Sequence, residues 1–243
     1  MKHDKLVWQA DFTRNGRPSD ADWEFELGGG GRGNQELQEY TDQPGNVWVQ
    51  DGVMHLCARR EEDGRYTSAR LTTSGRRSWQ YSRIEVEARL PRGNGTWPAI
   101  WMMPDSCRHQ REWPLCGEID IMEHVGPDED TVHYSLHSEL YNHMRGTQKT
   151  ARTHVQGTGA AFHTYGIDWD EAGIRFLVDG EEQAAFLKGA NGDDTTEEGW
   201  PFDQPFFLIL NVALGGWGGP VDNSALPCEM QVRAIRVYQA EQS

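Results

Sequence analysis

Short runs of alternating apolar and polar residues, separated by Gly, Asn, Asp and Pro, recur along the whole chain. Clear examples are residues 53–58 (VMHLCA), 84–90 (IEVEARL) and 174–178 (IRFLV), the last followed directly by Asp179-Gly180. A period of two is typical of strands with one buried face, and Asp-Gly after such a run predicts a hairpin turn. Long amphipathic helical patterns are absent. The pattern therefore predicts an all-β protein, most simply one β-sandwich.

The composition supports this fold class. The 243 residues include 27 Gly and 10 Trp, and abundant glycine with many aromatics favours a β-sandwich over a helical protein. No repeat, low-complexity linker or block of charge divides the chain, so we expect residues 1–243 to form a single domain. No apolar segment approaches the roughly 20 residues that cross a bilayer, and the first twelve residues lack the apolar core of a signal peptide.

The formal net charge of −15 bears on the class of ligand. It repels nucleic acids and sulfated polymers, whose binding depends on clustered Lys and Arg, and it favours a neutral or cationic ligand. Acidity that only provides solubility is an equally good interpretation. Among the cysteines, Cys57, Cys107, Cys116 and Cys228, no CxxC spacing indicates a zinc site. Whether Cys107 and Cys116 form a disulfide or remain thiols is left open.

The segment 117–124 (GEIDIMEH) is the most informative for chemistry. Strand alternation places Glu118 and Asp120 on one face, with the intervening isoleucines in the core. Continued alternation would bury Glu123 among them, which is costly for an unpaired carboxylate. A β-bulge at residues 121–122 returns Glu123 to the face of the other acids. Two carboxylates, one ionised and one protonated, are what glycosidic cleavage requires, although a solvated edge strand would also explain alternating acids.

Tryptophans near this segment favour a sugar ligand. Trp97 and Trp101 share one face of an extended run, whereas Ile100 and Met102 on the other face are available to the core. Indole rings are good platforms for the C–H faces of sugars. Trp113 and Trp217 lie in Gly- and Pro-containing segments and extend the same expected surface.

Other motifs carry less weight. Gly28, Gly30 and Gly33 satisfy GxGxxG, but without a βαβ unit they indicate a flexible loop. No HExxH accompanies His133, His137 and His143, so hydrogen bonding is favoured over metal binding, and no GxSxG supports a serine nucleophile.

These residues resemble glycoside hydrolase family 16, specifically its bacterial laminarinases. The central match is the Glu-x-Asp-x-x-Glu strand at residues 118–123. Further matches extend over nearly the whole chain, at residues 34–38 (NQELQ), 83–85 (RIE), 95–101 (GTWPAIW), 137–143 (HSELYNH), 162–165 (FHTY), 168–169 (DW) and 211–217 (NVALGGW).

The resemblance implies a β-jelly-roll of two curved antiparallel sheets with an open cleft on the concave face. It assigns Glu118 as nucleophile, Glu123 as acid/base and Asp120 as the residue that modulates the pair. The central subsites would be lined by Asn34, Arg83, Trp97, Trp101 and His137, with Ser82 standing where relatives usually have Gly. Many relatives carry a calcium-binding Asp at the position of Arg233, and a guanidinium cannot ligate a cation, so we expect neither calcium nor a cofactor.

The expected activity is endo-acting, retaining hydrolysis of β-1,3 linkages in a neutral glucan, because the strand with Met122 inserted is typical of the β-1,3 branch. The alternatives are a mixed-linkage β-1,3-1,4-glucanase, a galactan-cleaving relative and a non-catalytic β-glucan-binding module. We expect a monomer that acts outside the cell or at its surface, with no nucleic-acid or membrane partner.

Overall fold

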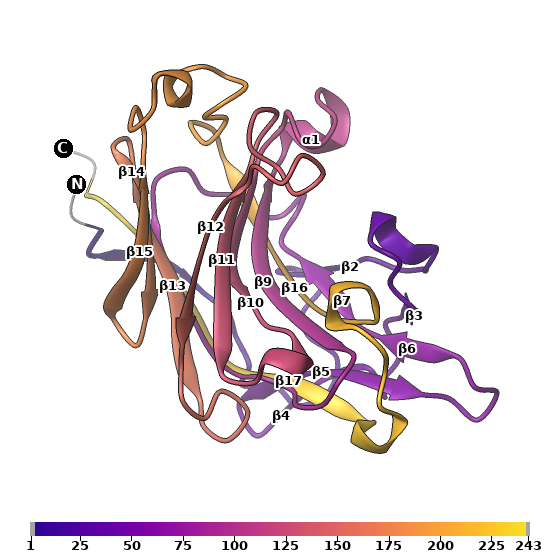
Figure 1. The fold of residues 1–243 in the computed structure, drawn as a ribbon. Coiled ribbons are helices and arrows are strands. Elements are labelled where there is room, and N and C mark those ends of the chain that lie inside the picture. The colour runs from indigo at the N-terminus through magenta and orange to yellow at the C-terminus, as the bar shows by residue number, and fades with distance from the viewer. Residues whose placement is uncertain (1–2, 242–243) are drawn as a thin grey trace.

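The structure is a computed structural model that describes residues 3–241, apart from the side chains of residues 108 and 109. Two β-sheets pack face to face in this range (Figure 1). One sheet has ten strands, in the order β15-β14-β13-β8-β17-β5-β6-β3, with β1 paired to β17 and β4 to β5. Its strands are β1 (Lys5–Gln9), β3 (Gln38–Tyr40), β4 (Val47–Gln50), β5 (Val53–Arg60), β6 (Tyr66–Ser68), β8 (Arg83–Arg89), β13 (His163–Asp170), β14 (Gly173–Val178), β15 (Glu181–Leu187) and β17 (Cys228–Gln239).

The second sheet has seven strands in the order β12-β11-β10-β9-β16-β7-β2. They are β2 (Glu24–Phe25), β7 (Arg70–Thr72), β9 (Thr96–Pro104), β10 (Glu118–Glu123), β11 (Thr131–His137), β12 (Lys149–His154) and β16 (Phe206–Leu214). The helical pieces are short: η1 (Gly31–Gly33), α1 (Ser106–His109), η2 (Gly126–Asp128), η3 (Gly192–Thr195), η4 (Gly216–Gly218) and η5 (Asn223–Ala225). No helix in the described range is long and apolar enough to span a bilayer.

The predicted fold class is confirmed. Strands far apart in sequence are neighbours, as in a jelly roll: β9 pairs with β16, and β8 pairs with β17. The pairings are antiparallel, with the exception of the parallel pair of β3 and β6. The three alternating runs lie in β5, β8 and β14, and the Asp-Gly turn is a hairpin in which Val178 pairs with Glu181. Asp179 and Gly180 have φ of 52° and 84°, which suits a two-residue hairpin loop.

The core lies between the sheets, where the apolar faces of β8 and β17 meet those of β9, β10 and β16. Strand β16 (FFLILNVAL) is buried at all nine positions and is apolar at every position except Asn211, so it shows no alternation. Its second face forms part of the floor of the hollow described below. Cys107 and Cys116 form a disulfide, with 5.2 Å between their Cα atoms, and Cys57 and Cys228 are buried thiols. The disulfide question that the sequence left open is thereby answered.

Candidate active site

Two adjoining hollows lie on the outer face of the seven-stranded sheet. One, of 430 Å³, lies over β9, β10, β16 and β7; the other, of 680 Å³, lies over β10, β11 and β12. Glu118 and Glu123 line both hollows, as do Asn34 and Trp97. The two hollows thus form one cleft across the sheet, with open space on both sides of the carboxylates.

The bulge predicted in β10 is confirmed. Asp120 pairs with Trp101 of β9 and Met122 pairs with Ile100, so one residue of β10 is extra between these pairs. Ile121 and Met122 are both fully buried. Because two successive side chains enter the core, Glu123 returns to the outer face, where it lines the cleft with Glu118 and Asp120.

The three acids are packed closely with a histidine from the next strand. His137 Nε2 of β11 lies 3.1 Å from Asp120 Oδ2 and 3.7 Å from Glu118 Oε1. On the other side of the strand, Trp97 Nε1 donates a hydrogen bond of 2.9 Å to Glu123 Oε1. Asp120 is only 3% exposed, so little water screens the charges in this cluster.

Burial raises the pKa of all three carboxyl groups. Burial, and then the charge of Asp120, raise the pKa of Glu118 to about 8. Burial raises the pKa of Asp120 to about 8, and burial with the charge of Asp120 raises the pKa of Glu123 to about 8. Trp97 and His137 oppose the shift at Glu123. Carboxylates this close do not all ionise together, so the cluster holds at least one proton near neutral pH.

Aromatic side chains form the walls of the cleft, as predicted. Trp97 and Trp101 of β9 both face it. Trp217 of η4 packs edge-on against Trp97, with 5.8 Å between ring centroids. Trp113, within the segment closed by the Cys107–Cys116 disulfide, lies 5.0 Å from the ring of His143. Asn34, directly after η1, also reaches the cleft.

The expectation for Arg83 is wrong. This residue begins β8 in the ten-stranded sheet, where it pairs with Asp168 of β13 and Tyr238 of β17. Its guanidinium forms an ion pair of 2.7 Å with Glu85, and it lines neither hollow. In β8, Ile84 and Val86 enter the core, so alternation sends Arg83 to the outer face of the opposite sheet.

Arg70 is the arginine that lines the cleft, at the first position of β7. Its guanidinium carbon lies 4.7 Å from the ring centroid of Trp101, and Nε lies 2.8 Å from Glu26 Oε2. Sequence reasoning missed it because Arg70 lies in the short run 70–72, whose partner β16 is more than 130 residues further along the chain.

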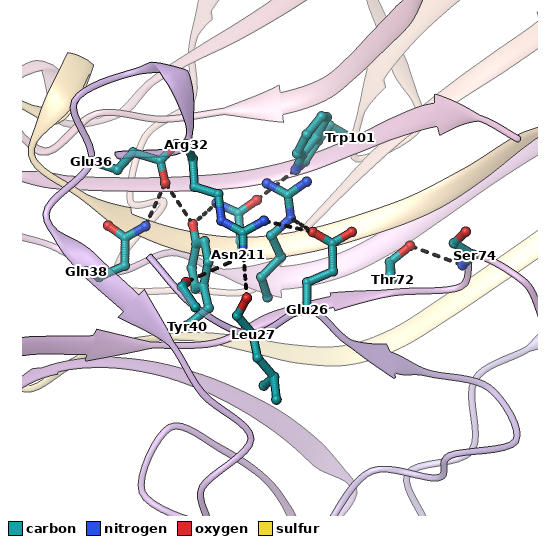
Figure 2. Close-up of polar contacts among 12 residues, drawn as sticks. Glu26, Leu27, Arg32, Glu36, Gln38, Tyr40, Thr72, Ser74, Trp101 and Asn211 are labelled. Carbon is teal, nitrogen blue, oxygen red and sulfur yellow. Dashed lines mark hydrogen bonds and ion pairs between the residues drawn. The ribbon is translucent and has the colours of Figure 1, made fainter. Parts of the chain in front are cut away.

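A chain of hydrogen bonds supports the same end of the cleft (Figure 2). Trp101 Nε1 donates to Asn211 Oδ1 at 2.7 Å, Asn211 Nδ2 donates to the Tyr40 hydroxyl at 3.1 Å, and Tyr40 donates to Glu36 Oε2 at 3.2 Å. Glu36 also accepts a bond of 2.6 Å from Gln38. Asn211 and Glu36 line the hollow and were not among the expected site residues. Their place within the resembling segments 211–217 and 34–38 was the available signal.

The glycine-rich segment borders this end of the cleft. Gly28, Gly30 and Gly33 lie between β2 and β3, with no βαβ unit, and Arg32 of η1 lines the hollow. Arg32 Nη1 donates to Glu26 Oε2 at 3.2 Å, so two arginines, Arg32 and Arg70, meet at one carboxylate. The GxGxxG pattern thus belongs to a loop that carries a cleft residue.

Of the three histidines considered for metal binding, all line the second hollow. Within residues 3–241, one group has three metal-ligand atoms within 4.8 Å of one another: Glu118, Asp120 and His137. Glu118 and Asp120 of this group both belong to the acidic strand β10, and hydrogen bonding remains our interpretation of His137.

Comparisons with known proteins agree with the geometry. Residues 34–231 match the model of glycosyl hydrolases family 16. A β-glucanase of Rhodothermus marinus is 46% identical over 245 residues, covering 98% of this chain and 86% of the relative. The solved laminarinase of Rhodothermus marinus superposes with a TM-score of 0.92 over 98% of both chains, at 46% identity.

SCLam, a non-specific endo-β-1,3(4)-glucanase, superposes with a TM-score of 0.91 at 39% identity over 99% of this chain and 94% of its own. These similarities identify the family of the chain, and the paired carboxylates of the cleft match the central strand of that family. The chain belongs to glycosyl hydrolases family 16.

Proposed function

We propose that this protein is an endo-acting, retaining β-glucanase that hydrolyses internal β-1,3 linkages of a neutral glucan such as laminarin. The observation that carries the proposal is the position of Glu118 and Glu123 at the junction of two hollows. A polysaccharide chain can extend to both sides of the carboxylates, as internal cleavage requires. Relatives described as a β-glucanase and a laminarinase support the substrate class.

The mechanism follows double displacement. An ionised Glu118 oxygen attacks the anomeric carbon while the bond from that carbon to the glycosidic oxygen breaks. Glu123 gives its proton to the departing oxygen, which leaves a covalent glycosyl ester on Glu118. Glu123, now ionised, takes a proton from water, and the resulting hydroxide oxygen displaces Glu118. The anomeric configuration is inverted twice and therefore retained.

The surroundings of each acid suit these roles. Glu118 has to be ionised for attack; burial and the charge of Asp120 raise its pKa to about 8, and His137 opposes this shift. Glu123 has to be protonated first, and burial with the charge of Asp120 raises its pKa to about 8. Asp120 lies between them in β10, and its protonation is coupled to that of the two glutamates. The chemistry needs no cofactor.

Three alternatives compete with this proposal. A non-catalytic β-glucan-binding module would bind without producing reducing ends, but the chain carries all three acids of the family strand. A mixed-linkage glucanase is favoured by one observation, the similarity to a non-specific endo-β-1,3(4)-glucanase. The galactan-cleaving alternative is weakened by the charge of −15, which disfavours sulfated polymers.

The protein is proposed to act outside the cell or at its surface, as a monomer. The Cys107–Cys116 disulfide supports this location, because disulfides persist in oxidising compartments.

The test is a comparison of laminarin with lichenan. We expect viscosity and chain length of laminarin to fall early, with short oligosaccharides as products, because the cleft is open on both sides. Reducing ends released from lichenan alone would contradict the β-1,3 assignment, and release from neither polymer would contradict the glucanase assignment. Glu118→Ala is the matched control for hydrolysis by a contaminant.

A further inference from the structure

Trp97 and Trp101 occupy equivalent faces of β9 but direct their indole N–H groups to different partners. Trp97 Nε1 donates to Glu123 Oε1 at 2.9 Å, whereas Trp101 Nε1 donates to Asn211 Oδ1 at 2.7 Å. One tryptophan therefore contacts the reacting acid, and the other contacts an uncharged amide on the cleft floor. A shared role as sugar platforms does not account for this difference.

The ring of Trp97 is held from two further sides. Trp217 packs against it edge-on at an interplanar angle of 85°, and His133 of β11 packs against Trp217, with 4.8 Å between centroids. The backbone of Gly216 approaches so closely that an added Cβ would lie 3.3 Å from the Trp97 ring and 2.5 Å from the Asn34 carbonyl oxygen. Gly216 also has φ of 52°, which favours glycine. These packing contacts fix the orientation of the Trp97 ring and therefore the direction of its indole N–H.

We propose that Trp97 is a positioning residue for the acid/base, in addition to any contact with sugar; this inference rests on the proposed glucanase function. An N–H donor at Oε1 favours the tautomer in which Oε1 is the carbonyl oxygen, because the carbonyl oxygen of a carboxylic acid is the stronger acceptor. The transferable proton of Glu123 therefore resides on the other oxygen, Oε2, and the carboxyl group has one defined orientation in both halves of the reaction.

The same bond adjusts the acidity of Glu123. A donor to a carboxylate favours its ionised form, so Trp97 lowers the pKa of Glu123 against burial. The other groups that act on this pKa are Asp120 on its own strand, which raises it, and His137 on β11, which lowers it. Glu118 on the same strand is coupled to Glu123, whose charge raises the pKa of Glu118. The residues paired with Glu123 on the neighbouring strands are His133 of β11 and Ala99 of β9. On the β9 side, the indole N–H is thus the polar group that acts on this carboxyl.

The experiment compares Trp97→Phe with Trp101→Phe, a matched loss of one indole N–H on the same strand and face. Without its donor, the pKa of Glu123 rises. The loss of kcat/KM at high pH, which reports deprotonation of the acid, then moves upward by about 1 pH unit in Trp97→Phe. Trp101→Phe should raise KM and leave the pH at which kcat/KM falls unchanged. A second Trp97 variant, with 3-benzothienylalanine at position 97, keeps the bicyclic ring and removes only the donor, and it should reproduce the shift.

A readout without turnover separates this inference from the proposed function. Titration of a ¹³C-labelled Glu123 carboxyl by NMR should show the same rise in pKa in both Trp97 variants, whether or not laminarin is hydrolysed. The inference would be overturned if the wild-type protein and the benzothienyl variant showed the same Glu123 titration curve and the same fall of kcat/KM at high pH. Trp97 would then act only as a stacking surface for sugar. If the wild-type protein hydrolyses no β-glucan but the pKa of Glu123 still rises in the Trp97 variants, the proposed function is rejected and the role of the hydrogen bond is kept.

Discussion

Arg70 and Arg83 each begin a strand, yet they face opposite sides of the molecule. Arg70 of β7 stacks on Trp101 in the cleft, and Arg83 of β8 pairs with Glu85 on the far sheet. We expect Arg70→Met to raise KM for laminarin about tenfold, because one charged hydrogen-bond donor is worth about 1.5 kcal/mol. Arg83→Met should leave kcat and KM unchanged. Steady-state kinetics of both variants check this, and an equal effect of the two substitutions would contradict the assignment.

The two glutamate roles are separable with azide on an aryl β-glucoside that carries a good leaving group. Glu118→Ala opens space on the face opposite the leaving group, so azide attacks directly and yields an α-glycosyl azide. Glu123→Ala still forms the covalent intermediate, because this leaving group needs no protonation, and azide then displaces Glu118 to yield the β-azide. NMR of the products distinguishes the anomers. The reverse pattern would exchange the two roles, and inversion of configuration in wild-type hydrolysis would reject double displacement.

Local rules placed the acids but could not place every cleft residue. The burial cost of Glu123 predicted the bulge, because it depends only on alternation within β10. The positions of Arg70, Asn211 and Tyr40 depend on how β16 pairs with β7 and on the loop that carries η1. These are contacts between segments far apart in the chain, and no period in the sequence encodes them. Arg83 was assigned to the cleft by the resemblance, and the pairing of β8 with β13 and β17 places it in the other sheet.

At the scale of elements, the bulge in β10 can be tested by deletion of one residue, Met122. Ile121 and Met122 both enter the core, so removal of Met122 restores simple alternation and keeps Glu123 on the cleft face. We expect the deletion variant to fold with a loss of about 2–5 kcal/mol, as for a buried methionine, and to retain activity clearly above that of Glu123→Ala. Thermal unfolding and reducing-end assays measure both. A folded but inactive variant would show that the bulge itself positions the acid.

Strand existence was predictable wherever one face is buried, as in β8, or where a turn has a strong signal, as after β14. The order of the strands was not, since β9 lies between β10 and β16 and β8 lies between β13 and β17. The resemblance to a family implied a jelly-roll of two antiparallel sheets but no order of strands within them. The predominantly apolar β16 has one face in the core, and its other face, with Asn211 and Ala213, forms part of the floor of the cleft.

At the scale of the whole molecule, the two sheets divide the work. The outer face of the seven-stranded sheet carries the cleft, and the outer face of the ten-stranded sheet carries ion pairs such as Arg83–Glu85 and Arg233–Glu87. Arg233, at the position where many relatives carry a calcium-binding Asp, lies on this second face. Arg233 Nη1 lies 2.9 Å from Glu87 Oε1, and the guanidinium carbon lies 3.9 Å from the ring centroid of Phe162.

We therefore predict that calcium does not stabilise this protein. One oxygen of the nearby Asp11 carboxylate, Oδ1, already accepts bonds from the Thr13 amide and hydroxyl at 2.8 and 2.6 Å. Arg233 adds a positive charge to the same surface hollow. A chelator should leave Tm unchanged in scanning calorimetry. Arg233→Asp is the informative counterpart, since it removes the cation and adds an oxygen ligand. At calcium about 100-fold above its Kd, binding would contribute about 2.7 kcal/mol, or roughly 5–11 °C in Tm. A wild-type Tm that falls with chelator and recovers with added calcium would show that backbone carbonyls bind the ion despite Arg233.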